Sequence, residues 1–490
     1  MRPEAPGIGD GYGDASGRAT ITLSFPRIAA HFFEPYAGFV LVLATIFGGG
    51  TRHGLWSDVI VQLAALPLLA WALFRLASKK LGGSGRWAMP LLCAIFALPL
   101  VHLVPLPPLL WTALPGRGAI ASAYQIAGMT LPWLPISLDP PATWRCLLSL
   151  IPAVAIFLAM LSLNKPGQRL MVGLILAIAF LNVPLDLLQV MGGDQSPLRF
   201  YAITNTDRAV GLFANANHNA ALLYCVIPLA VACIAGLIRG HHRNSFIGIV
   251  ALFILLAAAV IGIALTQSRA GLAIGFLGGL SSLGLLWSLR DRSRSARRIL
   301  FIGFGVNAIA LLIAFQFGFI GLSKKAENAD VIGDIRWPAA AVTMNAAIVN
   351  LPLGSGIGTF VPVYDMFAPR ALLSDHYLNH AHNDWIELLL TGGIPAAVIA
   401  LAFLAWFGRS SFLLWRSDPA SGQVLDLALA RAASIVIGSL LLHSFVDYPL
   451  RSGAVSAVFA VACSLLVLGD RHPKRRAAFK AQGEPAAHLP

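Results

Sequence analysis

The feature that most constrains this chain is a series of apolar runs of about 20 residues that recur along almost its whole length. Each run is long enough to cross the hydrocarbon core of a bilayer as a helix. In lipid the backbone must satisfy its own hydrogen bonds, so helices are expected. The predicted spans are centred on residues 40–47, 63–73, 91–100, 151–161, 174–181, 222–235, 249–259, 272–285, 302–315, 396–406, 435–442 and 455–466.

Composition agrees with this pattern, because 57% of the residues are hydrophobic and only 12% are charged. An average soluble domain has roughly 25% charged residues. We therefore expect an all-α, polytopic integral membrane protein. It should have about 12 transmembrane helices and one large extracytoplasmic loop that contains short helices.

Lysine and arginine gather in every second loop, at residues 79–86, 165–169, 239–243, 290–298 and 409–416 and in the tail. Such loops stay on the cytoplasmic side, so the alternate loops are extracytoplasmic and both termini are cytoplasmic. This arrangement accounts for the net charge of +13, which can also contact anionic lipid. The charge therefore indicates no nucleic-acid partner.

The spans divide the chain into five predicted parts. They are a disordered cytoplasmic N-terminus (1–30), nine spans (31–320) with extracytoplasmic loops near 105–145 and 192–217, a large extracytoplasmic loop (321–385), three spans (386–469) and a basic cytoplasmic tail (470–490).

Polar side chains cluster on the extracytoplasmic segments, where binding sites concentrate. The densest cluster lies in the large loop, where the glycine-rich run 352–360 precedes His380-Ala-His-Asn-Asp-Trp-Ile-Glu387. The glycines permit a tight turn or close approach to a ligand. Smaller polar groups lie at 208–219, at 267–269, and at 443–448 with Arg451. Helix capping is the alternative reading for the asparagines at 215–219, and Arg269 can instead snorkel to the membrane interface.

These segments resemble the O-antigen ligase and polymerase superfamily of bacterial envelope glycosyltransferases. The resemblance covers about residues 130–450 and rests on Pro352-Leu-Gly-Ser-Gly-Ile-Gly-Thr-Phe360 and on His380-Ala-His-Asn-Asp-Trp-Ile-Glu-Leu388 with Gly392. It also draws on Gln267-Ser-Arg-Ala-Gly271, Gly211-Leu-Phe-Ala-Asn-Ala-Asn217 and Ile136-Ser-Leu-Asp-Pro140.

The resemblance implies an inner-membrane enzyme that takes a glycan from undecaprenyl pyrophosphate in the periplasm, with inversion and without a metal or cofactor. Ligases pass the glycan to the lipid A core, whereas O-antigen and exopolysaccharide polymerases extend another glycan. By position, Arg208 and Arg269 would hold the pyrophosphate, His382 would be the base, and Arg336 would contact glycan or phosphate. Further substrate-binding residues would be Asn215, Asn217, His380 and Asn383.

The chemistry agrees with these assignments, because a planar guanidinium suits phosphate and an imidazole can take a proton from a sugar hydroxyl. Asp384 is predicted to orient His382, because Glu387 lies more than one helical turn beyond it. His380 is the rival base. The same four side chains are also candidate metal ligands, although His-x-His suits ligation best on a strand.

Two other function classes remain open from the sequence. A solute transporter, of the bicarbonate kind, is the main alternative. It is favoured by Asp186, which follows Pro184 inside the fifth span and can instead pair with an arginine of the site. A scaffold within an export complex would leave the histidine and asparagine cluster unexplained.

Overall fold

The structure, a computed structural model, describes residues 27–469 except 53, 78, 80–81, 241–244, 289–297, 299, 306, 309–311, 313–315, 317–335, 373–377 and 418–422. The side chains of residues 27–31 and 240 also lie outside that description. The predicted N-terminal segment, the basic tail and the start of the large loop therefore fall wholly or mostly outside the described residues.

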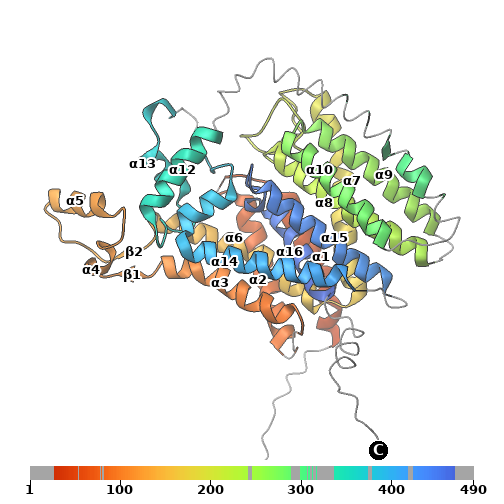
Figure 1. The fold of residues 1–490 in the computed structure, drawn as a ribbon, viewed down its shortest axis with the longest axis horizontal. Coiled ribbons are helices and arrows are strands. Elements are labelled where there is room, and N and C mark those ends of the chain that lie inside the picture. Colours follow the sequence, from red (N-terminus) through yellow and green to blue (C-terminus); the bar gives the residue numbers. More distant parts are fainter. Residues whose placement is uncertain are drawn as a thin grey trace, which may run out of the picture.

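Long helices make up most of the described chain (Figure 1). They are α1 (Arg27–Phe47), α2 (Trp56–Ala77), α3 (Gly85–His102), α6 (Pro140–Ser162), α7 (Lys165–Met191), α8 (Ala216–Gly240), α9 (Ser245–Leu265), α10 (Arg269–Ser288), α14 (Asp384–Trp415), α15 (Val424–His443) and α16 (Gly453–Gly469).

Among the described residues, nine helices are long and apolar enough to cross a membrane, and α16 and residues Phe32–Phe47 of α1 are shorter apolar helices. These eleven helices contain eleven of the predicted spans. The twelfth, at 302–315, lies on residues that are described only in part. The predicted all-α, polytopic membrane fold is confirmed. The number of spans stays a prediction.

Short elements lie together at one end of the long helices (Figure 1). The segment between α3 and α6 holds β1 (Pro105–Leu106), α4 (Pro108–Trp111), α5 (Gly118–Ile126) and β2 (Leu134–Pro135), and β1 and β2 pair antiparallel. The large loop holds α12 (Arg336–Asn350), α13 (Phe360–Phe367) and η2 (Arg370–Leu372). Helix α6 begins inside the predicted loop near 105–145, because the Asp139 side chain accepts a hydrogen bond from the Ala142 amide at 3.0 Å.

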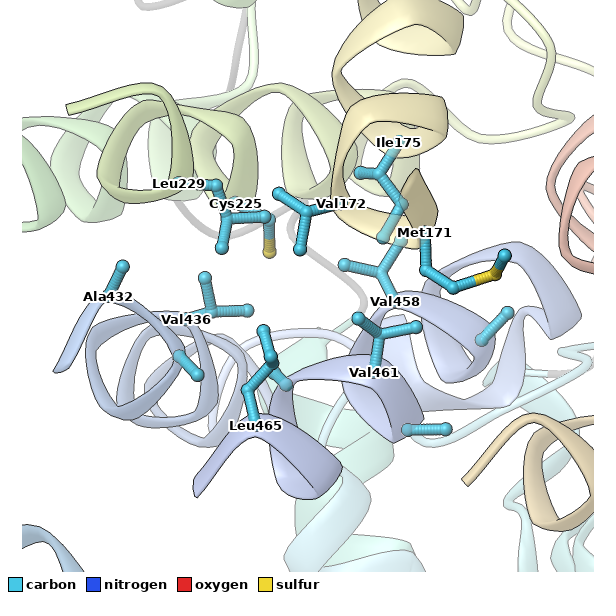
Figure 2. Close-up of a cluster of buried hydrophobic side chains, with 14 of the residues drawn as sticks. Met171, Val172, Ile175, Cys225, Leu229, Ala432, Val436, Val458, Val461 and Leu465 are labelled. Carbon is cyan, nitrogen blue, oxygen red and sulfur yellow. The ribbon is translucent and has the colours of Figure 1, made fainter. Parts of the chain in front are cut away.

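The apolar core runs between the long helices, and α8 packs against α9, α10 and α15. Figure 2 shows side chains of α7, α8, α15 and α16 meeting in this core, among them Met171, Cys225, Val436 and Val461. A second, smaller cluster joins the large loop to α14. Its members are Ala339, Ala346, Ala347, Phe360, Val363, Tyr364, Ala381 and Leu390. The large loop therefore packs against the N-terminal end of α14.

The glycine-rich run forms a packed turn between α12 and α13. Gly354 and Gly356 have φ values of +79° and +111°, which favour glycine. A Cβ on Gly354 would lie 2.6 Å from the backbone nitrogen of Gly393 in α14, and one on Gly356 would lie 2.6 Å from Cα of Ser137. These glycines therefore allow close backbone packing, as the tight-turn reading of the motif predicts.

Candidate active site

The segment before α14 presents the two predicted site histidines. Residues 380–383 are not helical, and His382 has φ +50°, in the left-handed region. The Asn383 side chain caps α14 by accepting hydrogen bonds from the Trp385 and Ile386 amides, both at 3.1 Å. Its amide nitrogen donates to the Phe445 carbonyl at 2.9 Å. Asn383, predicted to bind substrate, thus fixes the start of α14.

His382 is held by Asp447, in the short connection between α15 and α16. Its Nδ1 lies 2.9 Å from Oδ1 of Asp447, and Asn217 donates to Oδ2 of the same carboxylate at 2.5 Å. Burial alone would raise the pKa of Asp447, but the hydrogen bond from His382 and the neighbouring histidines hold it well below its usual range. Asp447 is therefore ionised, and Nδ1 of His382 is the proton-bearing nitrogen.

The prediction that Asp384 orients His382 is wrong. Nε of Arg451 donates to Oδ1 of Asp384 at 2.9 Å, and the Ser444 hydroxyl donates to Oδ2 at 3.0 Å. As the first residue of α14, Asp384 points its side chain toward the α15–α16 connection. There it meets Arg451 of η3 (Pro449–Arg451).

His380 belongs to a separate buried network. Its Nδ1 lies 3.0 Å from Oε1 of Glu387, which also lies 3.1 Å from Nη1 of Arg451. Burial alone would lower the pKa of Arg451, but the carboxylates of Glu387 and Asp384 hold it above its usual value. The His380 side chain is 7% exposed and that of His382 is 19% exposed. His382 is thus the more accessible of the two imidazoles.

Tyr448 lies between the histidines. Its ring centroid is 4.4 Å from that of His380 and 5.0 Å from those of His382 and His218. Asn379 donates to the Tyr448 hydroxyl at 3.3 Å. The buried Tyr448 ring therefore packs against both candidate bases. In a helix, two histidines separated by one residue would point in different directions, so this arrangement depends on the non-helical backbone of residues 380–383.

The asparagines at the start of α8 have different roles. The Asn215 side chain caps α8 by accepting from the Asn217 amide at 2.8 Å. Its amide nitrogen lies 3.5 Å from the Tyr448 hydroxyl. Asn217 contacts Asp447, and Asn219 donates to Asp186 at 2.6 Å. The capping reading thus holds for Asn215, and Asn217 belongs to the His382 cluster.

The three predicted arginines lie on three different segments, Arg208 in the loop before α8 and the other two at helix starts. Arg208 forms an ion pair with neighbouring Asp207 at 2.6 Å, and Arg269 is the exposed first residue of α10. The adjoining Ala209 amide donates to the Leu265 carbonyl at the end of α9, so the Arg208 segment lies beside the α9–α10 turn. Among the described residues, neither arginine hydrogen-bonds to His382. Arg336 begins α12.

The structure also bears on the transporter and metal-site alternatives. Asp186 accepts from Asn182 and Asn219 rather than from an arginine. In the part of the chain that the structure describes, no group of three or more His, Cys, Asp or Glu side chains is arranged to hold a metal ion. No observation there favours a transporter.

Three residues of the cluster had no predicted role, namely Asp447, Tyr448 and Arg451. The signal was present, because the polar run 443–448 with Arg451 stands out at the end of a span. Sequence spacing pointed instead to Asp384, which is near His382 along the chain.

No curated protein matches this chain. The family model described as "O-Antigen ligase" matches residues 252–401. The match includes α10, α12, α13, His382 and the first half of α14, whereas Arg208 and Asp447 lie outside it. The match confirms the resemblance predicted from the motifs and supports placing this chain in the O-antigen ligase and polymerase superfamily.

Proposed function

We propose that this protein transfers a glycan from undecaprenyl pyrophosphate to a sugar hydroxyl on the periplasmic face of the bacterial inner membrane. The acceptor is the lipid A core for a ligase, or another glycan for an O-antigen or exopolysaccharide polymerase. The observation that carries this proposal is the His382–Asp447 pair, whose histidine lies within the matched region.

The reaction is a single displacement. The acceptor hydroxyl oxygen attacks the anomeric carbon, the bond from that carbon to the pyrophosphate oxygen breaks, and configuration inverts. Nε2 of His382 takes the hydroxyl proton, because Nδ1 is engaged by Asp447. The undecaprenyl pyrophosphate leaves as an anion, and fixed guanidinium groups stabilise the charge that develops on it.

His382 suits the role of base better than His380. Its side chain is more exposed, and among the described residues its Nε2 has no hydrogen-bond partner in the protein. His380 is tied to Glu387, whose carboxylate also pairs with Arg451. We therefore assign orientation of the base to Asp447, and assign His380, Asp384 and Arg451 to the frame around it.

We assign the donor pyrophosphate to Arg208 and Arg269. The backbone contact between Ala209 and Leu265 brings their segments together, and both side chains retain solvent access. Arg269 also stands at the start of α10, where the helix dipole favours an anion. Arg336, at the start of α12, is assigned to the glycan or a second phosphate. The polyprenyl tail enters laterally from the bilayer.

The test is glycan profiling of a strain that lacks the gene and carries wild type, His382→Ala, Arg208→Ala or Arg370→Ala. Arg370 is the matched control, since it is an exposed arginine of the same large loop as His382. The lipopolysaccharide ladder, secreted polysaccharide and membrane level of each variant are read together.

We expect wild type and Arg370→Ala to restore one glycan and the other two variants to fail at normal abundance. Loss of capped core would identify a ligase, and accumulation of single repeats would identify a polymerase. Full complementation by both His382→Ala and Arg208→Ala would refute the proposed site.

A further inference from the structure

The second half of helix α7 carries three polar residues in an otherwise apolar sequence. Asn182, Asp186 and Gln189 follow one another at intervals of four and three residues, so they share one helix face. All three are buried. Buried polar groups in a membrane protein are costly unless they are paired, so their partners indicate what this face is for.

Gln189 makes four hydrogen bonds, all to the backbone of the segment that joins α7 to α8. Its carbonyl oxygen accepts from the Val210 and Gly211 amides at 3.0 and 2.8 Å. Its amide nitrogen donates to the Leu198 and Gly211 carbonyls, both at 2.9 Å. A primary amide has two donors and two acceptor positions, so this side chain is fully used.

Asn182 and Asp186 continue these hydrogen bonds from α7 to the start of α8. Asn182 accepts from the Leu212 amide at 3.0 Å and donates to Asn219 at 2.8 Å. Asp186 accepts from Asn182 at 3.1 Å and from Asn219 at 2.6 Å. Gly211, with φ +55°, has no room for a Cβ, which would lie 2.2 Å from Oδ1 of Asn182. Residues 210–212 are therefore packed tightly against α7 and hydrogen-bonded to it.

Arg208 lies directly before this attached stretch. Arg199 holds the preceding residues by donating to the carbonyls of Asn205 and Thr206 at 2.8 and 2.6 Å. It also donates to the carbonyl of Arg208 itself at 2.9 Å. The backbone of Arg208 is thus fixed on both sides, while its side chain ends in the exposed pair with Asp207. A residue that is preorganised to bind a ligand needs a fixed backbone and an accessible side chain, and Arg208 has both.

We propose that Gln189 is a positioning residue that sets the place of Arg208 for the donor pyrophosphate, through the backbone of residues 209–211. This inference rests on the proposed function, which assigns the pyrophosphate to Arg208. The first turn of α8 links the two halves of the site, because Asn219 holds the α7 network and Asn217 holds Asp447.

The test measures binding of undecaprenyl pyrophosphate, without a glycan, to the full-length protein in lipid nanodiscs. Gln189→Met keeps the shape of the side chain and removes its hydrogen bonds. Gln168→Met is the matched control on the same helix, because Gln168 donates to the Leu163 carbonyl near the other end of α7. Arg208→Ala and the double variant Gln189→Met with Arg208→Ala complete the set.

We expect Arg208→Ala and Gln189→Met each to weaken binding roughly 10- to 100-fold, and Gln168→Met to leave it unchanged. The double variant should bind no more weakly than Arg208→Ala alone, because Gln189 acts through Arg208. A purely structural role for Gln189 predicts instead that the two losses add.

Normal binding by a folded Gln189→Met, or additive losses in the double variant, would overturn the inference. If Gln189→Met does not accumulate in the membrane, Gln189→Glu is measured in its place. It keeps the acceptors for Val210 and Gly211 and loses both donors, so weaker binding supports the inference and normal binding overturns it. Normal binding by Arg208→Ala would instead contradict the proposed function.

Discussion

Replacing Asp447 with asparagine tests the proposed mechanism most directly. The carboxylate offers one oxygen to His382 and the other to Asn217. An amide at that position has a single acceptor oxygen, so only one of these two donors keeps its partner. If Asn217 keeps it, the new NH2 group faces Nδ1 of His382. The imidazole then carries its proton on Nε2, and that nitrogen can no longer accept a proton from the acceptor hydroxyl.

The expected loss follows from the contribution of a positioned base, which is roughly 10²- to 10⁴-fold in rate. At 1.36 kcal/mol for each factor of ten, this corresponds to about 2.7 to 5.4 kcal/mol of activation free energy. The cost in stability should be smaller, about 1–3 kcal/mol, because one buried donor loses its acceptor. The rate should therefore fall far more than the amount of folded protein.

The assay is glycan transfer in proteoliposomes, with the rate expressed per folded protein. Asp384→Asn is the control, because it changes an aspartate near His382 in sequence that contacts Arg451 and Ser444 instead. We expect it to retain a much larger share of the transfer rate per folded protein. Wild-type turnover by Asp447→Asn, together with a severe loss in Asp384→Asn, would refute the assignment and restore the sequence-based pairing.

The same aspartate gives a dependence of stability on pH. Because its folded pKa lies below the unfolded value of about 3.9, it stabilises the fold above that value and loses its contribution as the pH falls through the folded pKa. The melting temperature in detergent should therefore be insensitive to this group between about pH 5 and about pH 8, and should fall below about pH 4. Asp447→Asn should lessen that fall, and an equal fall in both proteins would contradict the reasoning.

Three further predictions concern the frame and the topology. Gly354→Ala should destabilise the protein by about 1–3 kcal/mol or more, seen as a lower melting temperature, because it adds backbone strain and a clash with α14; Gly193→Ala, with φ +65° and no neighbour within 4 Å, measures the strain alone. Arg451→Met should lower the stability by about 3–5 kcal/mol, because the buried carboxylate of Glu387 and the partly buried carboxylate of Asp384 lose their cation; a normal melting temperature would show that both carboxyl groups are neutral. In a cysteine-free background, Ile126→Cys in α5 should react with a membrane-impermeant thiol reagent from the periplasm and Arg416→Cys should not, and the reverse pattern would invert the topology.

The sequence motifs locate the candidate site, but they do not identify which side chains contact one another within it. His382 and Asn217, both predicted site residues, do come together, because each contacts Asp447. The glycine-rich run was also open to a ligand-binding role, and only the structure shows that Gly354 packs against the backbone of α14. Asn383 likewise stands out as polar, yet its side chain is used to cap a helix.

The sequence by itself determined the class of fold, because each span is a local property. A run of apolar residues must be helical in lipid whatever its neighbours are, and basic loops predict the side on which each connection lies. The contacts between helices are not local. Asp447 lies 65 residues from His382 and 230 from Asn217, and these three side chains meet only because α8 and α14 begin at the place where α15 ends. Helix packing, which no short-range spacing encodes, therefore decided which carboxylate holds the base.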